Sequence, residues 1–259
     1  MLDFLDKLAR DAKETTESDY YEITTPIRRS DVSLKKAVLK SPHVPVITEI
    51  KTASPSKGII RTDFDPGKIA HEMEKGGALG ISVLTEPKNF NGSMNSLAEI
   101  RQEVRIPVLM KDIIISSIQL EAASKSGADT VLLICELFSR GYCECEVEEM
   151  IAKAHKKNLE VLLETHNEEE FRFAVRTEAD LVGINNRNLS TFQVDLNVTK
   201  RILGHCETNG KNIVSESGIE SPVDIRFLRE SGANAFLVGS AIMLADNVES
   251  KVRELVSEF

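Results

Sequence analysis

The segment KSGADTVLLI, residues 125–134, leads from the end of a helix-like pattern through a turn of small residues into a short apolar run. Segments with the same order of features occur at 75–84 (KGGALGISVL), 176–184 (RTEADLVGI) and 230–239 (ESGANAFLVG). A helix that ends near glycine, followed by a run of Val, Ile and Leu, is typical of alternating helices and buried strands. The segments begin about fifty residues apart, which fits two strand–helix units of about 25 residues each. The repeat therefore predicts an α/β fold.

Short apolar runs along the chain predict eight strands, at 46–51, 79–85, 108–112, 130–135, 160–165, 181–185, 212–216 and 235–239. Between them lie amphipathic stretches with helix start and stop signals, such as DPGKIAHEMEKGG (65–77), SSIQLEAASKSG (116–127) and SPVDIRFLRESG (221–232). Eight such units match a (β/α)₈ TIM barrel, although a doubly wound open sheet uses the same local pattern. No Gly-x-Gly-x-x-Gly turn follows the first run, and the barrel is therefore favoured.

Residues 1–45 precede the first predicted strand and are expected to form a helical extension, while residues 46–259 are expected to form the barrel. We expect the two parts to make up a single domain. An apolar stripe at helical spacing and the stretch DVSLKKAVLKS (31–41) predict two helices in this extension; the stripe consists of Leu2, Leu5, Leu8, Ala9 and Ala12. We expect the extension to cap one end of the barrel; a helix that binds a partner is the alternative.

The composition excludes several classes of protein. Of the 259 residues, 41% are hydrophobic and 28% charged, and the formal net charge is −9, which argues against a general binder of nucleic acid or of a membrane surface. No apolar run is long enough to span a bilayer, and the first twenty residues do not resemble a signal peptide. The cysteines lack a paired spacing and are interpreted as free thiols in the cytoplasm rather than as disulfides or metal ligands; they are Cys135, Cys143, Cys145 and Cys206.

Charged and amide residues gather where the predicted strands end. They are Glu49 and Lys51, Lys111 and Asp112, Glu164 and His166, Asn185 and Arg187, and Glu216 and Ser217. Barrels collect their chemistry at the carboxyl ends of the strands, and residues two apart share a face of a strand. One charge at a strand end is often only a solvent contact, but this set can neutralise itself while supplying acids and bases. His166 is interpreted as a structural hydrogen-bonding residue, so the chemistry falls to lysine and glutamate.

Glycines directly after the last two predicted strands indicate a phosphate site. Gly218, Gly239 and Ser240 occupy the two loops that often hold phosphate in such barrels. The histidines are scattered, and the chain has neither a Gly-x-Ser-x-Gly elbow nor a P-loop. We therefore expect no metal.

Eight motifs together resemble those of the indole-3-glycerol phosphate synthase family, in the same order and at similar spacing. They are EIKTASPSKG (49–58), SVLTEPKNFNGS (82–93), IPVLMKD (106–112), ADTVLLI (128–134), LLETHNEEE (162–170), GINNRNL (183–189), SESGI (215–219) and NAFLVGSAIM (234–243). The first motif and GINNR are specific, whereas the phosphate loops occur in many barrels. The resemblance runs from about residue 46 to the end of the sequence and implies a (β/α)₈ barrel without a cofactor.

The resemblance also implies an activity. The family is a carboxy-lyase of tryptophan biosynthesis that converts 1-(2-carboxyphenylamino)-1-deoxyribulose 5-phosphate to indole-3-glycerol phosphate, CO₂ and water. Lys111 would be the general acid of ring closure, while Lys51, Glu49 and Glu164 are candidates for the acid and base of dehydration. Crowding of opposite charges is expected to move the pKa values of these groups toward the working pH.

By the same resemblance, the substrate-binding residues would be Ser54, Phe90, Asn91, Leu132, Asn185, Arg187, Glu216, Ser217 and Leu237, with phosphate at Gly218, Gly239 and Ser240. Two other readings stay open: a different phosphosugar enzyme, such as an isomerase or a Schiff-base aldolase that uses Lys111 or Lys51, and a non-catalytic phosphosugar-binding subunit. The expected partner is a small phosphosugar, with no nucleic acid and no membrane. The sequence does not choose between monomer and homodimer, or decide whether other enzymes of the pathway bind.

Overall fold

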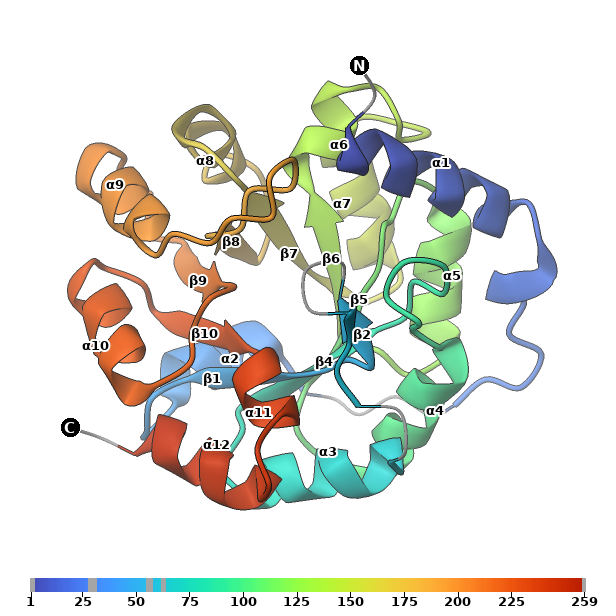
Figure 1. Ribbon diagram of the computed structural model, residues 1–259. Coiled ribbons are helices and arrows are strands. Elements are labelled where there is room, and N and C mark those ends of the chain that lie inside the picture. The colour runs from blue at the N-terminus through green and yellow to red at the C-terminus, as the bar shows by residue number, and fades with distance from the viewer. Residues whose placement is uncertain (1–2, 28–31, 55–57, 62–63, 258–259) are drawn as a thin grey trace.

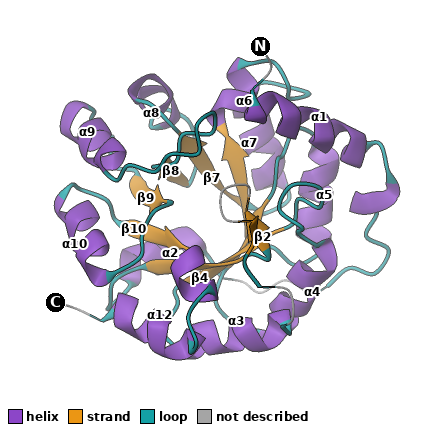
Figure 2. Cartoon of the chain, in the orientation of Figure 1, coloured by secondary structure: helices purple, strands orange, loops and turns teal. Residues whose placement is uncertain are grey.

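The computed structural model of the chain describes residues 3–27, 32–54, 58–61 and 64–257. Within these ranges, eight parallel strands close into a barrel in the order β1-β10-β9-β8-β7-β6-β5-β4, and a ring of helices surrounds it (Figures 1 and 2). The strands are β1 Val46–Ile50, β4 Gly80–Leu84, β5 Val108–Lys111, β6 Thr130–Ile134, β7 Glu160–Thr165, β8 Leu181–Asn185, β9 Asn212–Glu216 and β10 Ala235–Val238. Strand β1 pairs with both β10 and β4, which closes the barrel and excludes the open sheet.

Each predicted strand is present to within one residue at either end. Alternate residues of the strands point to opposite sides, so the apolar runs serve two cores. Ile47, Leu109 and Leu162 fill the interior of the barrel, whereas Ile81 and Val131 face the surrounding helices. Full burial of such a side chain contributes about 1.5–3 kcal/mol relative to exposure, which explains why the strands carry so few polar residues before their ends.

The helices after the extension are α3 Pro66–Lys75, α4 Met94–Glu103, α5 Ser117–Lys125, α6 Cys135–Ser139, α7 Val147–Lys156, α8 Glu168–Ala174, α9 Asn197–His205, α10 Pro222–Glu230, α11 Ser240–Met243 and α12 Val248–Val256. The repeated segment 125–134 has a simple local explanation. Gly127 and Gly232 adopt left-handed φ values of +84° and +106° directly after their helices, a conformation that glycine adopts without strain. In the segment 176–184 the turn uses no left-handed residue, although it leads equally into strand β8.

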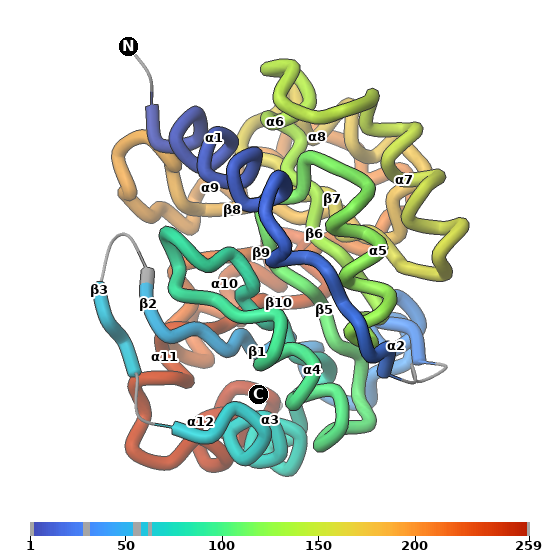
Figure 3. Tube along the Cα trace, turned by 90° about the vertical axis from the view of Figure 1, so that its right-hand side faces the viewer, coloured from blue at the N-terminus to red at the C-terminus, as the bar shows by residue number. Residues whose placement is uncertain are grey.

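The extension contains α1 Phe4–Thr16, the 3₁₀ turn η1 Asp19–Tyr21 and α2 Leu34–Lys40. Helix α1 lies over the carboxyl ends of the strands, as expected of a cap, and buries the predicted stripe except for Leu2, which lies outside the described residues. Helix α2 differs from the expectation of one covered end, because it lies across the amino ends of the strands (Figure 3). There the backbone N–H of Lys35 donates to Glu160, the first residue of β7. The extension therefore contacts both ends of the barrel.

A short antiparallel pair, β2 Ala53–Ser54 and β3 Gly58–Ile59, follows β1. Among the described residues, no helix has the length and apolar character needed to cross a membrane.

Candidate active site

A cavity of about 350 Å³ opens at the carboxyl ends of the strands. Most of the residues that the sequence indicated line it, namely Glu49, Lys51, Phe90, Lys111, Leu132, Glu164, Asn185, Arg187, Ser217, Gly218, Leu237, Gly239 and Ser240. The alternation of side chains along each strand is the cause. Residues two apart, such as Glu49 and Lys51 or Asn185 and Arg187, both reach the cavity, as the spacing predicted.

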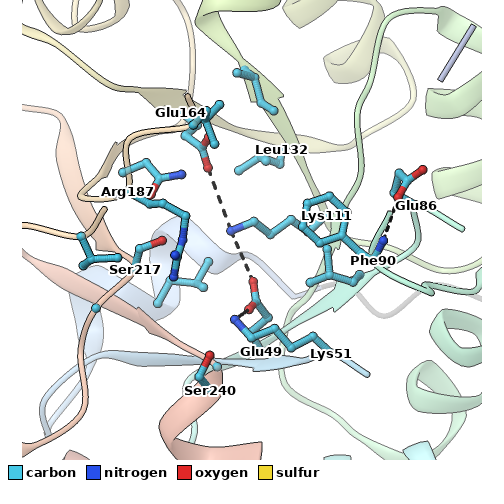
Figure 4. Close-up of a pocket in the computed structure, with 18 of the residues that line it drawn as sticks. Glu49, Lys51, Glu86, Phe90, Lys111, Leu132, Glu164, Arg187, Ser217 and Ser240 are labelled. Atoms are coloured by element: carbon cyan, nitrogen blue, oxygen red, sulfur yellow. Dashed lines mark hydrogen bonds and ion pairs between the residues drawn. The ribbon is translucent and has the colours of Figure 1, made fainter. Parts of the chain in front are cut away.

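Lys111, the last residue of β5, lies among carboxylates that come from three other strands. Figure 4 shows two of them, Glu49 and Glu164. Nζ of Lys111 is 2.9 Å from Oε2 of Glu216, 3.3 Å from Oε1 of Glu49 and 4.0 Å from Oε2 of Glu164. On the other side of Glu49, Nζ of Lys51 is 2.6 Å from Oε2. Glu49 therefore joins two ammonium groups that both line the cavity.

The charges of this cluster fix its protonation. Burial alone would lower the pKa of Lys111, but the carboxylates of Glu216, Glu49 and Glu164 outweigh it and raise that pKa far above its ordinary value. Burial alone would raise the pKa of Glu49, whereas Lys51 and Lys111 hold it at about 2. The expectation that crowding moves these pKa values toward the working pH is therefore wrong for both residues. Each is fixed in its charged form.

Glu216 differs from its neighbours because it is fully buried beneath Lys111 and does not line the cavity. Burial raises the pKa of its carboxyl, against the opposing charge of Lys111. Gly183, on the neighbouring strand β8, leaves the space for this carboxylate, since a Cβ there would collide with Oε1 of Glu216. Glu216 was expected to contact a substrate directly, but it contacts Lys111 and does not line this cavity.

Gly239 has a role that the sequence did not indicate. A Cβ at this position would collide with Oε2 of Glu49 and press on Nζ and Cε of Lys51. Gly239 therefore does more than line the expected phosphate corner, because it gives the Glu49–Lys51 ion pair its room.

Arg187 points into the cavity from the loop after β8 (Figure 4). Its backbone N–H donates to Oδ1 of Asn185 at 3.0 Å, and its Nη1 donates to the carbonyl of Phe192 at 3.1 Å. An isolated antiparallel β-bridge also pairs Arg187 with Val194, so the loop after β8 folds back on itself where it lines the cavity. Burial lowers the pKa of this guanidinium, which nevertheless stays a cation at any ordinary pH.

The expected phosphate corner has an unusual backbone. Ser217 and Gly218 are consecutive left-handed residues with φ of +67° and +82°, and both line the cavity beside Ser240, the first residue of α11. Nδ2 of the buried Asn186 donates to the carbonyl oxygens of Glu216 and Ser217, at 2.9 and 3.3 Å. These bonds hold the loop after β9 against the loop after β8.

The opposite wall is apolar, and part of it was missed. Phe90 and Leu132 lie there as expected, and Phe4 and Leu8 of α1 join them; Leu237 also lines the cavity, but from β10, the strand that leads to Gly239 and Ser240. The ring of Phe4 meets the ring of Phe192 edge to face, with centroids 5.0 Å apart. Strand parity could have found Ile134, which also lines the cavity two residues after Leu132, but no local signal places α1 here.

Glu86 is another residue that sequence reasoning missed. It is buried at the cavity wall, and its carboxylate accepts from the backbone N–H groups of Lys88, Asn89 and Phe90 at 2.7–3.0 Å. Figure 4 shows the contact between Glu86 and Phe90. Glu86 therefore shapes the loop that presents the Phe90 ring.

Besides Glu216, the predicted residue Asn91 does not line the cavity, and the position of the Ser54 side chain is not described. Asn91 adopts a left-handed φ of +51° and lines a separate cleft beside Thr52. Ser54 belongs to β2, but its side chain lies outside the described part of the structure. The four cysteines are free thiols, and the described ranges contain no group of three or more His, Cys, Asp or Glu side chains placed to hold a metal ion.

Comparison with known proteins gives a consistent answer. The family model for indole-3-glycerol phosphate synthase matches residues 5–255. The indole-3-glycerol phosphate synthase of Endomicrobium trichonymphae is 43% identical over 88% of this chain and 86% of its own, and that of Neisseria meningitidis serogroup C is 44% identical over 81% and 78%.

Among solved structures, thiamine phosphate pyrophosphorylase from Pyrococcus furiosus aligns with a TM-score of 0.61 at 19% identity, over 86% of this chain and 96% of that one. The N-acetylmannosamine-6-phosphate 2-epimerase from Clostridium perfringens aligns with a TM-score of 0.62 at 16% identity, over 83% and 93%. At such identity these two share the fold alone with this chain. The family match and the curated relatives go further, and the chain belongs to the indole-3-glycerol phosphate synthase family.

Proposed function

We propose that the protein converts 1-(2-carboxyphenylamino)-1-deoxyribulose 5-phosphate to indole-3-glycerol phosphate, with release of CO₂ and water, as a carboxy-lyase of tryptophan biosynthesis. One observation carries the proposal. The ammonium of Lys111 lies at the cavity floor among carboxylates, between a corner that suits an anion and a wall that suits an aromatic ring. The four free thiols support a place in the reducing cytoplasm.

Binding would hold the substrate at both ends. The phosphate would be bound by backbone and hydroxyl donors of Ser217, Gly218 and Ser240. The carboxylate would be bound by Arg187, because a guanidinium can donate two parallel hydrogen bonds to a carboxylate. The anthranilate ring would lie against Phe90 and the leucines of the apolar wall. Fixing both ends brings the ring carbon to the ketone, and such orientation contributes up to about 7–11 kcal/mol to the reduction of a barrier.

In the first step, the ring carbon that bears the carboxylate attacks the ketone carbon, and the carbonyl oxygen takes a proton from Lys111. Loss of CO₂ returns the electron pair of the broken C–C bond to the ring and restores its aromaticity. Solvent later returns the proton to Lys111. The raised pKa of Lys111 argues against a Schiff base, because only the neutral amine attacks a carbonyl. The same shift makes the ammonium a weak acid, so it would give up its proton only as the ketone oxygen becomes an alkoxide.

In the second step, the hydroxyl leaves as water with a proton from an acid, and a base accepts the proton from the carbon next to nitrogen. A pKa of about 2 makes Glu49 a poor base, and its oxygens are already bound to Lys51 and Lys111. We therefore assign the base to Glu164 and the acid to Lys51. Glu49 would hold the two lysines in place.

The test is a steady-state assay with this substrate that follows indole fluorescence and released CO₂, beside the Lys111→Ala variant. The chain contains no tryptophan, so its own fluorescence is low. We expect equal amounts of both products, and a loss of about 10²–10⁴-fold in the variant. Binding of the substrate without turnover, or a lysine adduct trapped by borohydride, would refute the proposal and favour one of the other phosphosugar chemistries.

A further inference from the structure

His166 lies directly behind the proposed base. It follows β7 and shares a face with Glu164, two residues earlier. Its Nε2 is 3.3 Å from Oε1 of Glu164, and only 11% of its side chain is exposed. This is an ion contact rather than a hydrogen bond, and within the described residues neither buried ring nitrogen of His166 has a hydrogen-bond partner. The imidazole is therefore packed against the side of Glu164 that faces away from Lys111.

The other side of the imidazole faces a second carboxylate. Nδ1 of His166 is 3.6 Å from Oε2 of Glu170, in the first turn of α8. That carboxylate is fixed, because Oε2 also accepts from the backbone N–H of His166 at 2.8 Å and Oε1 accepts from Nδ2 of Asn167. The ring is thus held between a carboxylate of β7 and a carboxylate of α8.

This surrounding favours the imidazolium form. Burial alone would lower the pKa of His166, but Glu170, Glu164 and the more distant Glu136 of α6 outweigh it and raise that pKa above its ordinary value. Glu164 consequently faces a cation at each oxygen: His166 at Oε1, and Lys111 at Oε2 at 4.0 Å. These two ion contacts favour an orientation of the carboxylate in which Oε1 faces His166 and Oε2 faces Lys111.

We propose that His166 is a positioning residue for dehydration, which binds Oε1 of Glu164 from behind the cavity wall and so directs Oε2 at the substrate. This inference rests on the proposed role of Glu164 as base. Without His166, Glu164 would be free to turn both oxygens toward Lys111. Its carboxylate would then pair with that ammonium and no longer face the substrate as a base. This role goes beyond the structural one that the sequence indicated for His166.

Two variants separate charge from shape. His166→Gln keeps a donor for Oε1 but no charge, and His166→Phe keeps only the bulk of the ring. His155→Gln is the matched control, since Nε2 of His155 contacts Asp180 at 2.9 Å and neither residue lines the cavity. We expect kcat to fall about tenfold or more in His166→Phe and about threefold in His166→Gln, with KM within twofold of the parent. The control should match the parent.

The pH profile gives a readout that a structural role would not change. An imidazolium favours the ionised form of a neighbouring carboxylate, so its loss moves the acid limb of kcat to higher pH, by about half a unit or more, in both variants at His166. A second readout needs no activity. In protein with ¹⁵N-labelled histidine, Glu164→Gln and Glu170→Gln should each lower the titration midpoint of His166.

The outcomes are distinct. The inference would be overturned if the acid limb of kcat were unchanged in both His166 variants and the titration midpoint of His166 were the same in Glu164→Gln as in the parent. His166 would then be a structural residue. A rise in KM with unchanged kcat would also overturn it, because it would place His166 in substrate binding. A parent that forms no product would refute the proposed function, and this inference with it, whereas an active parent with unaltered profiles refutes the inference alone.

Discussion

Lys111 is the residue on which the charge balance of the cavity depends. The fully buried Glu216 lies 2.9 Å below it, and burial already raises the pKa of that carboxyl despite the ammonium. A carboxyl with a raised folded pKa contributes stability at pH values below its unfolded pKa, and this contribution is lost as the pH rises through the folded pKa. Lys111 is therefore the group that compensates the buried charge when Glu216 ionises.

Lys111→Met should consequently unfold more easily at high pH. Without the ammonium, ionisation of Glu216 leaves an uncompensated buried charge, so the free energy of unfolding should fall by about 2 kcal/mol or more between pH 5 and pH 8, relative to the parent. Urea unfolding at both pH values measures this. Lys153→Met removes partly exposed ion pairs with Glu144 and Glu149 and a long hydrogen bond to Sγ of Cys145, and should show no such trend. A parallel pH dependence of Lys111→Met and the parent would contradict the account.

Gly239→Ala tests a contact that only the structure revealed. The added methyl group would displace the Glu49–Lys51 pair, and we expect kcat/KM to fall by roughly tenfold or more. Gly204→Ala in α9 is the control, because a Cβ there meets no atom within 4 Å and alanine is the better helix former. Steady-state kinetics of both variants provide the test. Equal activity of the two would show that a methyl group at position 239 does not displace the Glu49–Lys51 ion pair.

At the scale of elements, the 3₁₀ turn η1 is tied to the end of β5. The hydroxyl of Tyr21 donates to Oδ2 of Asp112 at 3.0 Å and accepts from Nε2 of Gln119 at 3.1 Å. Burial raises the pKa of Asp112 to about 6, although the hydrogen bonds from Thr85, Ile113 and Tyr21 oppose it. The residue next to Lys111 is thus anchored from the extension.

Tyr21→Phe removes one donor to this buried carboxylate. We expect a loss of about 1–3 kcal/mol in the free energy of unfolding, larger at pH 8 than at pH 5, since the ionised form of Asp112 is the one that needs the donor. Tyr20→Phe is the control. The hydroxyl of Tyr20 donates to the Thr85 carbonyl and accepts from the backbone N–H of Met94, so the loss of unfolding free energy in this variant should not depend on pH. Chemical denaturation of both variants at the two pH values provides the comparison. Identical pH trends would mean that Tyr21 does not stabilise the Asp112 carboxylate.

The elements also show what a sequence can predict. Apolar runs and period-two parity depend on neighbours in the chain, so the strands and the paired cavity residues Glu49 and Lys51 followed from local pattern. The contacts of Phe4 with Phe192 and of Gly239 with Glu49 join residues far apart in sequence, and no local signal carries them. The direction of the pKa shifts was equally inaccessible, because it depends on which charges burial brings together.

At the scale of the whole molecule, the extension covers both ends of one barrel, and the two ends have different tasks. Leu34 of α2 is buried at the amino ends of the strands, near Gly80, whereas Leu8 of α1 is buried at the cavity. In such barrels the amino-terminal face serves stability and the carboxyl-terminal face carries the chemistry.

Leu34→Ala and Leu8→Ala should therefore separate stability from activity. Each is expected to lower the free energy of unfolding by about 2–5 kcal/mol, as large-to-small changes in a core do. Only Leu8→Ala should also raise KM, because its side chain is part of the apolar wall. Unfolding curves and steady-state kinetics test the pair, and a raised KM in Leu34→Ala would refute the division.

The most direct test of the account is a single-turnover experiment that follows CO₂ and indole fluorescence separately in the parent, Lys111→Ala and Glu164→Gln. We predict that the parent releases both products together and that Lys111→Ala releases neither at a comparable rate. Glu164→Gln should release CO₂ while the indole signal lags, because ring closure is intact and dehydration is not. Release of CO₂ by Lys111→Ala at the parent rate, or equal loss of both signals in Glu164→Gln, would contradict the assignment of the two steps to these residues.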